Sequence, residues 1–331
     1  MTFSSYMSEW LYGPEGYYTN YKAIGKSGDF YTSVSTSKFF GGTIAKHIVS
    51  LVDDGFIKED STVCEIGAHH GYLMADIIEF IYTLRPKLLE SFNFVIIERK
   101  EELQAHQRRY FEECFGDVIN LTHYTSLDQM QVDNAFFYAN EIFDAFPCEL
   151  IYKGKVADVN GHDITFERDD EAISAIAKKQ NRDRGEIAVG YQAFATEMSG
   201  AAKTFEFMSF DYGEMAARSD FSIRVYAEHK VIPLFDDDIK REEHFGKADI
   251  TYDVVFSQVK EEFIAAGLEF VAFNAQMTAL VEMGLLDLLS ELHKHAEEKI
   301  YKQELEKAKM LIMPDFLGER FKMIKFRQTG Q

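Results

Sequence analysis

The first 150 residues alternate between short, continuous apolar runs and longer segments whose apolar residues recur at helical spacing. The short runs predict buried β-strands, and the longer segments predict amphipathic helices. Strands that alternate with helices indicate βαβ units, so we expect a doubly wound α/β fold with a mostly parallel sheet. In chain order, the predicted elements are a helix at Lys38–Val52, a strand at Thr62–Ile66, a helix at Tyr72–Leu84, a strand at Asn93–Ile97, a helix at about Glu101–Phe115, and strands at Thr122–Tyr124 and Ala135–Ala139.

The pattern changes after Pro147. Alternating segments flank Asn160-Gly161, a dipeptide typical of two-residue turns, and predict a β-hairpin. We expect Asp169–Gly190 to be a surface loop or helix and the charge run Asp236–Glu243 to be a solvated loop. Near the N-terminus, Gly13-Pro14 predicts a turn followed by an extended piece. Further strands are predicted at Thr204–Phe210, Glu269–Phe273 and Phe321–Phe326, and further helices at Tyr252–Ala266, Thr278–Leu292 and Ala296–Leu311.

Composition limits the function classes. The 331 residues are 46% apolar, which excludes a disordered chain. The net charge of -20 and the lack of a basic stripe argue against a nucleic-acid partner. An acidic surface suits a cationic partner, such as a protein that presents arginine, although a charge that only maintains solubility explains it equally well. The three cysteines, Cys64, Cys114 and Cys148, lack metal-ligand spacing. With no secretory signal and no bilayer-length apolar run, we expect a soluble, cytoplasmic protein without membrane insertion.

Polar residues follow two of the predicted strands. The turn Glu65–Gly71 lies between a strand and a helix, where glycine permits close backbone approach and the helix start offers free N–H groups. Glu98 directly follows the strand Asn93–Ile97. A carboxylate at that place in a doubly wound fold accepts hydrogen bonds from the ribose of a nucleoside cofactor. An ordinary turn and a solvated strand-end acid remain the alternatives.

A third polar group follows the predicted strand Ala135–Ala139. If the chain turns helical after Asn140, then Glu141 and Asp144 lie close together on one face and can clamp a guanidinium. In the competing interpretation, Asn140 caps this helix and Asp144 lies in its first turn. Both interpretations stay open.

The order of motifs resembles that of the MidA family. Its N-terminal signature is similar to Tyr12–Tyr18 (YGPEGYY), Gly28–Ser33 (GDFYTS) and Phe39–Gly41. Its cofactor loop, its acidic second-strand end and its Asn-Glu-x-x-Asp-Ala-x-Pro motif correspond to Glu65–Gly71, Glu98 and Asn140–Pro147. Later matches are Phe210–Gly213, Arg224–Tyr226 with His229, Asp249–Asp253, Asn274–Gln276 and Met313–Lys322.

The resemblance implies a class I methyltransferase that uses S-adenosyl-L-methionine and transfers a methyl group to arginine of a protein, such as a respiratory-complex subunit. We expect residues 1–60 to pack over the cofactor site, 61–147 plus 200–331 to form the core with C-terminal additions, and 148–199 to be an inserted hairpin and helical segment. A homodimer is left open. The expected catalytic residues are Asp144, Glu141 and His229, and the expected cofactor-binding residues are Gly28, Asp29, Thr32, Glu65, Gly67, Ala68, Gly71, Glu98 and Asn140, with no metal.

One position departs from the family. His69 stands where the cofactor loop has its middle glycine, and this side chain can crowd or cover the methionine end of the cofactor. A non-catalytic assembly or scaffold protein with a degenerate cofactor site is therefore the alternative function. An NAD-dependent oxidoreductase is a weaker third hypothesis, because the loop departs from Gly-x-Gly-x-x-Gly.

Overall fold

The computed structural model describes residues 1–19, 32–227 and 230–330. Contacts divide the chain into two compact units. The core unit comprises Thr32–Asn140, Ala193–Asp211 and Phe263–Gln331, and the accessory unit comprises Met1–Tyr31, Glu141–Gln192 and Tyr212–Glu262. Each unit is described separately.

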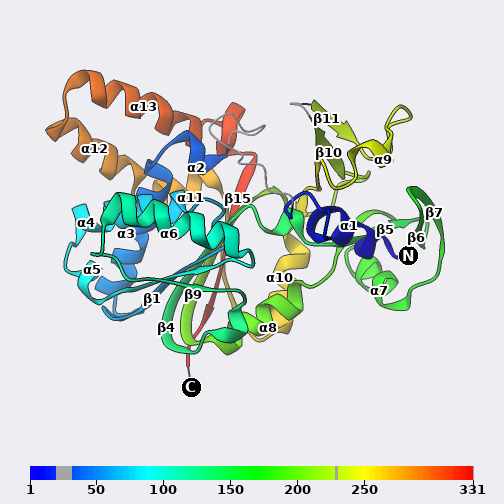
Figure 1. Cartoon of the computed structure of the whole chain (residues 1–331), viewed down its shortest axis with the longest axis horizontal. Coiled ribbons are helices and arrows are strands. Elements are labelled where there is room, and N and C mark those ends of the chain that lie inside the picture. The colour runs from blue at the N-terminus through cyan, green and yellow to red at the C-terminus, as the bar shows by residue number, and fades with distance from the viewer. Residues whose placement is uncertain (20–31, 228–229, 331) are drawn as a thin grey trace. The chain divides into compact units, whose positions relative to one another are not determined.

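The core unit is built on one twisted sheet with helices on both faces (Figure 1). Its strand order is β14-β15-β9-β4-β1-β2-β3, and the five strands from β9 to β3 are mutually parallel. This arrangement confirms the predicted doubly wound α/β class. The strands are β1 (Thr62–Ile66), β2 (Asn93–Ile97), β3 (Leu121–Tyr124), β4 (Val132–Asn140), β9 (Ala202–Glu214), β14 (Glu269–Ala275) and β15 (Phe321–Gln328).

The helices of the core unit follow the predicted alternation. They are α2 (Ser33–Thr36), α3 (Phe39–Asp53), α4 (Tyr72–Leu84), α5 (Leu88–Ser91), α6 (Glu101–Phe115), α11 (Gln276–Glu282), α12 (Leu285–His295) and α13 (Glu298–Ile312). Two more helices, α8 (Tyr191–Ala201) and α10 (Phe256–Ala265), begin in the accessory unit and end in the core unit. The last three residues of β9 belong to the accessory unit.

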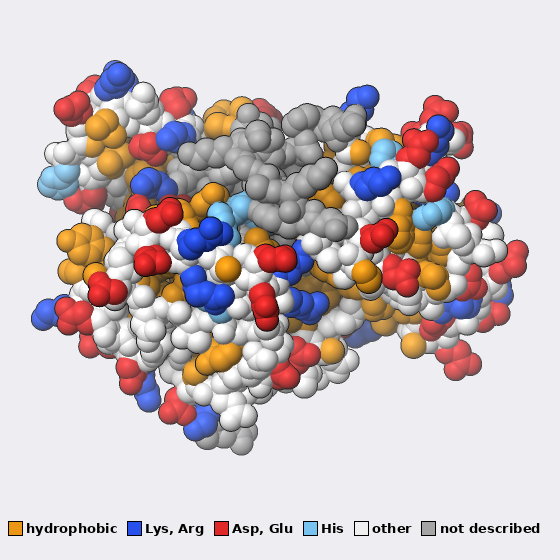
Figure 2. All heavy atoms as spheres, viewed as in Figure 1, with side chains coloured by type: hydrophobic (Ala, Val, Ile, Leu, Met, Phe, Trp, Pro, Cys, Tyr) orange, Lys and Arg blue, Asp and Glu red, His pale blue; other side chains and the backbone are white. Residues whose placement is uncertain are grey.

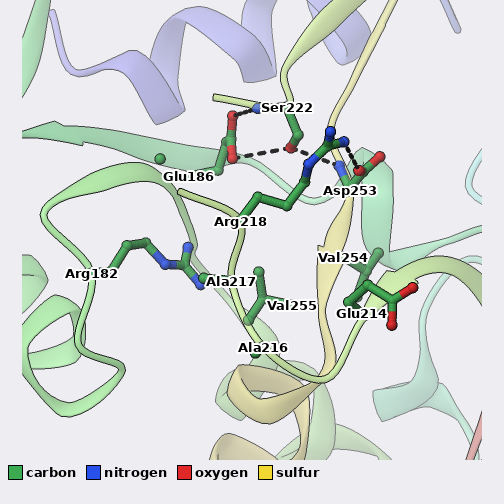
Figure 3. A pocket seen from close by; sticks show the side chains of 11 residues that line it. Arg182, Glu186, Glu214, Ala216, Ala217, Arg218, Ser222, Asp253, Val254 and Val255 are labelled. Atoms are coloured by element: carbon green, nitrogen blue, oxygen red, sulfur yellow. Dashed lines mark hydrogen bonds and ion pairs between the residues drawn. The ribbon is translucent and has the colours of Figure 1, made fainter. Parts of the chain in front are cut away.

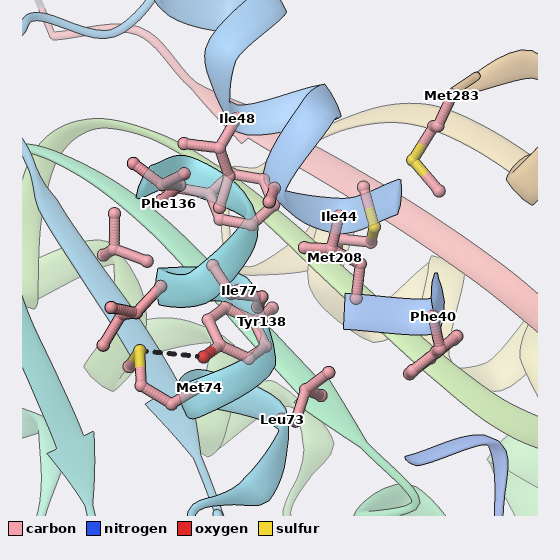
Figure 4. Close-up of a cluster of buried hydrophobic side chains, with 14 of the residues drawn as sticks. Phe40, Ile44, Ile48, Leu73, Met74, Ile77, Phe136, Tyr138, Met208 and Met283 are labelled. Atoms are coloured by element: carbon pink, nitrogen blue, oxygen red, sulfur yellow. Dashed lines mark hydrogen bonds between the residues drawn. The ribbon is translucent and has the colours of Figure 1, made fainter. Parts of the chain in front are cut away.

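One apolar cluster fixes α3 and α4 on the sheet (Figure 4). Ile44 and Ile48 of α3 and Ile77 of α4 are buried against Phe136 and Tyr138 of β4. Each such side chain contributes about 1.5–3 kcal/mol through burial. The opposite face of the sheet buries a second aromatic set, in which the ring of Phe207 lies 5.7 Å from that of Phe263.

The strand register decides which loops meet. Ile66 at the end of β1 pairs with Ile97 of β2 and with Ala139 of β4. All three strands are parallel, so the residues that follow them lie along one edge of the sheet. Gly67, Glu98 and Asn140 therefore converge at the carboxyl edge of the core unit.

The accessory unit contains two small antiparallel sheets. One has the order β7-β6-β5-β8 and the other β11-β10-β12. Its first helix buries Trp10, whose Nε1 donates to the carbonyl of Ala248 at 2.7 Å. The elements are α1 (Phe3–Tyr12), β5 (Cys148–Tyr152), β6 (Lys155–Asn160), β7 (Asp163–Arg168), α7 (Glu171–Lys179), β8 (Arg184–Ala188), β10 (Arg224–Ala227), β11 (Lys230–Pro233), α9 (Arg241–His244), β12 (Asp249–Thr251) and β13 (Val254–Val255).

Several predicted elements need correction. The predicted extended N-terminal stretch is preceded by α1, and Asp169–Gly190 contains the strand β8 as well as α7. The predicted helix Thr278–Leu292 is two helices, because Gly284 adopts a φ of 95° between α11 and α12. The hairpin at Asn160-Gly161 is confirmed by the pairing of Asn160 with Asp163.

The two units do not coincide with the three segments predicted from the sequence, which divided the chain at residues 60, 147 and 200. The packing of residues 1–60 over the cofactor site stays a prediction.

A buried charge cluster in the core unit gives a test of stability. Glu206 of β9 is fully buried and accepts hydrogen bonds from Arg327 Nε at 2.7 Å and His47 Nε2 at 2.5 Å. Burial alone would raise the pKa of Glu206, but His47, Lys325 and Arg327 hold it below its usual value.

We expect Glu206→Gln to lower the free energy of unfolding by about 2–4 kcal/mol, because Arg327 loses its buried counter-charge. The difference from wild type should shrink as the pH falls below about 4.5, since the depressed pKa means that the stabilisation is present above that value and is lost on protonation. Urea unfolding at several pH values measures this. Glu269→Gln, on the exposed end of the edge strand β14, is the matched control and should change stability by less than about 0.5 kcal/mol.

Candidate functional site

The loop between β1 and α4 has the backbone of a ligand-binding turn. Gly67 and Gly71 adopt φ values of 71° and 80°, which side chains disfavour. A Cβ at Gly71 would also lie 2.9 Å from the ring of Phe111. Gly67 is exposed, so the backbone at the carboxyl end of β1 is open to a ligand. The first turn of α4 follows directly and adds the positive end of a helix.

His69 occupies the middle of this loop with a φ of 49°. Its ring lies against that of His70, with centroids 4.2 Å apart, and its carbonyl accepts from Gln107 Nε2 at 2.8 Å. Burial, followed by the proximity of His70, lowers the pKa of His69 to about 4, so the imidazole is neutral at pH 7. The side chain thus packs on His70 and leaves Gly67 exposed, so it does not close the loop at Gly67.

Glu65 is buried beneath the loop, with 3% of its surface exposed. Its Oε2 accepts from the Tyr138 hydroxyl at 3.2 Å and from the Met74 backbone N–H at 3.1 Å. Tyr138 also contacts the Met74 sulfur, as Figure 4 shows. Burial raises the pKa of Glu65 to about 8. The carboxyl group therefore links β1 to β4 and to the start of α4, and it is largely protonated at neutral pH.

Glu98 lies at the end of β2, one strand away from the loop. Its Oε1 accepts from the Lys100 backbone N–H at 3.1 Å, and its own N–H donates to the carbonyl of Tyr124 at 2.9 Å. Burial raises the pKa of this carboxyl group. The Lys100 ammonium is buried and has no hydrogen-bond partner among the described residues. Sequence reasoning missed Lys100, and nothing in its spacing distinguishes it from a surface lysine.

These features test whether the carboxyl edge fits a nucleoside cofactor. The edge offers an open glycine backbone, a helix start and the carboxylate of Glu98. The Lys100 ammonium is a buried donor that a ligand's acceptor atoms would satisfy. The donor and acceptor set therefore fits a nucleoside that carries hydroxyl groups and a charged amino-acid end.

The predicted helix after Asn140 does not form. Asn140 is the last residue of β4, Glu141 has a φ of 54°, and only a single 3₁₀ turn follows at Phe143–Ala145. The predictions that Glu141 and Asp144 share a helix face, and that Asn140 caps a helix, are therefore wrong. The positive φ at Glu141 turns the chain before the periodicity of a helix can begin.

Asp144 lies within the accessory unit, four residues after β4 ends. It is 8% exposed, and its Oδ2 accepts from the Tyr212 hydroxyl at 2.6 Å and from Thr251 Oγ1 at 2.7 Å. Burial raises the pKa of Asp144, although both hydroxyls and the nearby Arg224 oppose the increase. Hydroxyl donors thus hold this carboxyl group in place, and among the described residues it forms no ion pair.

Asp249, at the start of β12, is a second acid that sequence reasoning did not assign to the site. Burial, and then the nearby Asp144, raises the pKa of Asp249 to about 7. The only signal for it in the sequence was its place in the family match Asp249–Asp253.

The remaining predicted residues are placed as follows. Gly28, Asp29 and His229 lie outside the described residues. Thr32 caps α2, where its hydroxyl accepts from the Ser35 N–H at 3.1 Å. Ala68 is buried within the loop.

A small pocket lies wholly within the accessory unit (Figure 3). None of the predicted site residues lines it. Glu186 accepts from the Ser222 N–H at 2.7 Å, Ser222 Oγ accepts from the Asp253 N–H at 3.0 Å, and Arg218 pairs with Asp253 at 2.6 Å. These groups mainly satisfy each other, so they brace β8 against the loop that follows β9.

The surface carries both signs of charge. Acidic and basic side chains are interspersed over the described part of the face in Figure 2, without a continuous basic stripe. Among the described residues, every helix is too short or too polar to cross a bilayer. The cytoplasmic location stays a prediction.

Residues 43–274 match the protein family described as "Putative S-adenosyl-L-methionine-dependent methyltransferase". The chain is 25% identical over 367 residues to the mitochondrial protein arginine methyltransferase NDUFAF7 of Rattus norvegicus, covering 97% of this chain and 79% of the relative. The Danio rerio protein of the same name is 25% identical over 375 residues, covering 99% and 83%.

A solved structure has the same fold. A crystal structure of a protein from Burkholderia thailandensis, bound to S-adenosyl-homocysteine, superposes with a TM-score of 0.81 at 22% identity, and the match covers 99% of this chain and 88% of that one. The family match spans more than half of the chain and confirms the resemblance drawn from the motifs. The protein therefore belongs to this methyltransferase family, whose cofactor is S-adenosyl-L-methionine.

Proposed function

We propose that this methyltransferase acts on an arginine of a partner protein. One observation carries the proposal: the carboxyl group of Asp144 is buried and held by two hydroxyls, without a neutralising ion pair among those described. Such a group is a ready acceptor for a planar cation with several donors. The activity named for the mitochondrial relatives supports the same acceptor for this chain. A respiratory-chain subunit is the partner that the resemblance favours.

The carboxyl edge of the core unit would hold the cofactor. The exposed backbone at Gly67, with Ala68 and Gly71 beside it, suits close approach of the methionine end. Glu98 would accept from the ribose hydroxyls, and the buried Lys100 ammonium would donate to the nucleoside. Glu65 would act through the loop that it fixes, while Asn140 lies at the end of the neighbouring strand. Gly28, Asp29 and Thr32 stay proposed contacts.

When bound, the cofactor supplies an electrophilic methyl group on a sulfonium. The protein then has to orient a guanidinium nitrogen and receive its proton as the nitrogen–carbon bond forms and the sulfur–carbon bond breaks. A guanidinium has a pKa above about 12 and is a poor nucleophile until a base polarises it. The raised pKa of Asp144 makes it a stronger base than an exposed aspartate. Glu141 and His229 are proposed as further acid-base groups.

The first test concerns Glu98. We expect Glu98→Ala to weaken S-adenosyl-homocysteine binding by at least about tenfold, because two charge-assisted hydrogen bonds to the ribose are lost. Isothermal titration calorimetry measures this, and Glu113→Ala, an exposed acid on α6, should bind like wild type. If wild type does not bind the cofactor at millimolar concentration, the alternative function, a non-catalytic scaffold protein with a degenerate cofactor site, is supported instead.

The second test concerns Glu65. At pH 7 its carboxyl group is mostly protonated, since its pKa of about 8 lies above the solution pH. A cationic amino group nearby favours the carboxylate, so cofactor binding should release a proton from Glu65 and affinity should rise from pH 6 to pH 8. Calorimetry in buffers of different ionisation enthalpy counts the proton. Glu65→Gln should remove this proton release, and an unchanged release would exclude Glu65 as its source.

The third test concerns Asp144. We expect Asp144→Asn, and equally Asp144→Ala, to lower methyl transfer by at least about 10²-fold while S-adenosyl-homocysteine still binds. The assay is mass spectrometry of methylated arginine in proteins captured from a deletion strain and complemented with wild type or variant. Turnover close to wild type in Asp144→Asn would remove Asp144 from the mechanism. Methylation only of residues other than arginine would refute the proposed acceptor.

A further inference from the structure

One face of the three-stranded sheet in the accessory unit concentrates polar and aromatic groups. Asp249 and Thr251 are two residues apart on β12, so their side chains point to the same side. Thr251 Oγ1 donates to Asp144, which places Asp144 on that side too. In the antiparallel register, Tyr226 stands opposite Asp249 and Arg224 stands opposite Thr251. The face therefore gathers two acids from separate segments together with aromatic and cationic neighbours.

The hydrogen bonding of Asp249 is incomplete. Its Oδ2 accepts from the Tyr18 hydroxyl at 3.4 Å, a long and therefore weak bond. Its Oδ1 is buried and has no hydrogen-bond partner among the described residues. A buried carboxylate oxygen without a donor costs free energy that a ligand's N–H groups would recover.

The cation of this face, Arg224, has partners at Nη1 and Nε, while its buried Nη2 has none among the described residues. Arg224 Nη1 donates to Asp253 Oδ1 at 2.7 Å and to the Ser222 carbonyl at 2.9 Å, and its Nε donates to the Tyr226 hydroxyl. Its guanidinium lies over the Tyr212 ring, 5.0 Å from the centroid. Asp253 forms the ion pair with Arg224, and the Arg224 charge also acts to lower the pKa of Asp144 and of Asp249 without an ion pair to either among the described residues. Arg224 therefore faces three carboxyl groups. The same contacts show that the face can hold a guanidinium against a tyrosine ring.

Tyr18 contacts Asp249, and two further N-terminal tyrosines pack on Tyr18. The rings of Tyr12 and Tyr18 stack with centroids 5.7 Å apart, and the ring of Tyr17 meets that of Tyr18 edge-on at 5.1 Å. The Tyr12 hydroxyl donates to the carbonyl of Ala145, next to Asp144. Aromatic faces attract planar cations, and guanidinium more than ammonium because it stacks as well as donates.

We propose that Asp249 is the second carboxylate of the acceptor site, which receives one edge of the substrate guanidinium while Asp144 receives another. Tyr18, with Tyr12 and Tyr17 packed on it, forms an aromatic wall for this group. The inference rests on the proposed function in one respect, namely that the guanidinium is the methyl acceptor. It also gives the site a preference for arginine over lysine, since a planar guanidinium can present a pair of N–H groups to a carboxylate and stack on an aromatic ring, whereas an ammonium donates from a single atom.

The test measures binding without turnover. Wild type saturated with S-adenosyl-homocysteine is titrated with N-acetyl-arginine methylamide, and binding is followed through the ring resonances of ¹³C-labelled tyrosine. We expect saturable binding by wild type and an affinity at least about tenfold lower for Asp249→Asn, because a charge-assisted pair is lost. Asp237→Asn, an exposed acid of the same unit, is the matched control and should bind like wild type. N-acetyl-lysine methylamide should bind wild type more weakly than the arginine compound.

The outcomes separate this inference from the proposed function. Absent arginine binding by wild type, or equal binding by wild type and Asp249→Asn, overturns the role of Asp249. Binding that depends on Asp249, in a protein that methylates no arginine, upholds the inference and refutes the proposed reaction. Cofactor affinity of Asp249→Asn should equal that of wild type. A loss of cofactor affinity together with thermal destabilisation would show a structural role and also overturn the inference.

Discussion

The parallel register of β1 with β2 and β4 is the constraint on which the cofactor site depends. Ile66 pairs with both Ile97 and Ala139, so the connections that follow β1, β2 and β4 leave the sheet at one edge. Only there can an open glycine backbone, a helix start and the carboxylate of Glu98 act on one ligand. A shift of β2 by one residue would turn its apolar side chains to the opposite faces, and the apolar cluster around Phe136 resists that change.

Buried carboxyl groups in both units are held by neutral donors. Glu65 bonds to the hydroxyl of Tyr138 and to a backbone N–H, and Asp144 bonds to the hydroxyls of Tyr212 and Thr251. Because desolvation is only partly offset, the pKa of each group is raised. By contrast, Glu206 has cationic partners, and its pKa is lowered. The difference marks the first two groups as sensitive to an incoming cation and the third as part of the framework.

The sequence predicted the helix Tyr72–Leu84 and the strand Asn93–Ile97 with the bounds that the structure has. Gly71 and Pro86 fix the two ends of that helix, and for this reason its bounds could be predicted from the sequence. The helix α1 was missed, although Phe3, Met7 and Trp10 carry its helical spacing. The strand β8 was not predicted, because it contains the charged residue Glu186. Three hydrogen bonds from Ser222 and Ile223 to the Glu186 carboxylate allow this side chain to be buried. The helix expected after Asn140 failed for a local reason, the positive φ at Glu141.

The sequence by itself determined the alternation of strands and helices, the loop Glu65–Gly71 and the acid that ends β2, because these follow from backbone periodicity and from glycine. Only the tertiary structure decided that Asp144 receives the hydroxyl of Thr251, 107 residues away, and that Asp249 shares its face. Such contacts depend on how whole segments pack. The spacing of residues along the chain does not predict which distant donor will bond to a buried carboxyl group.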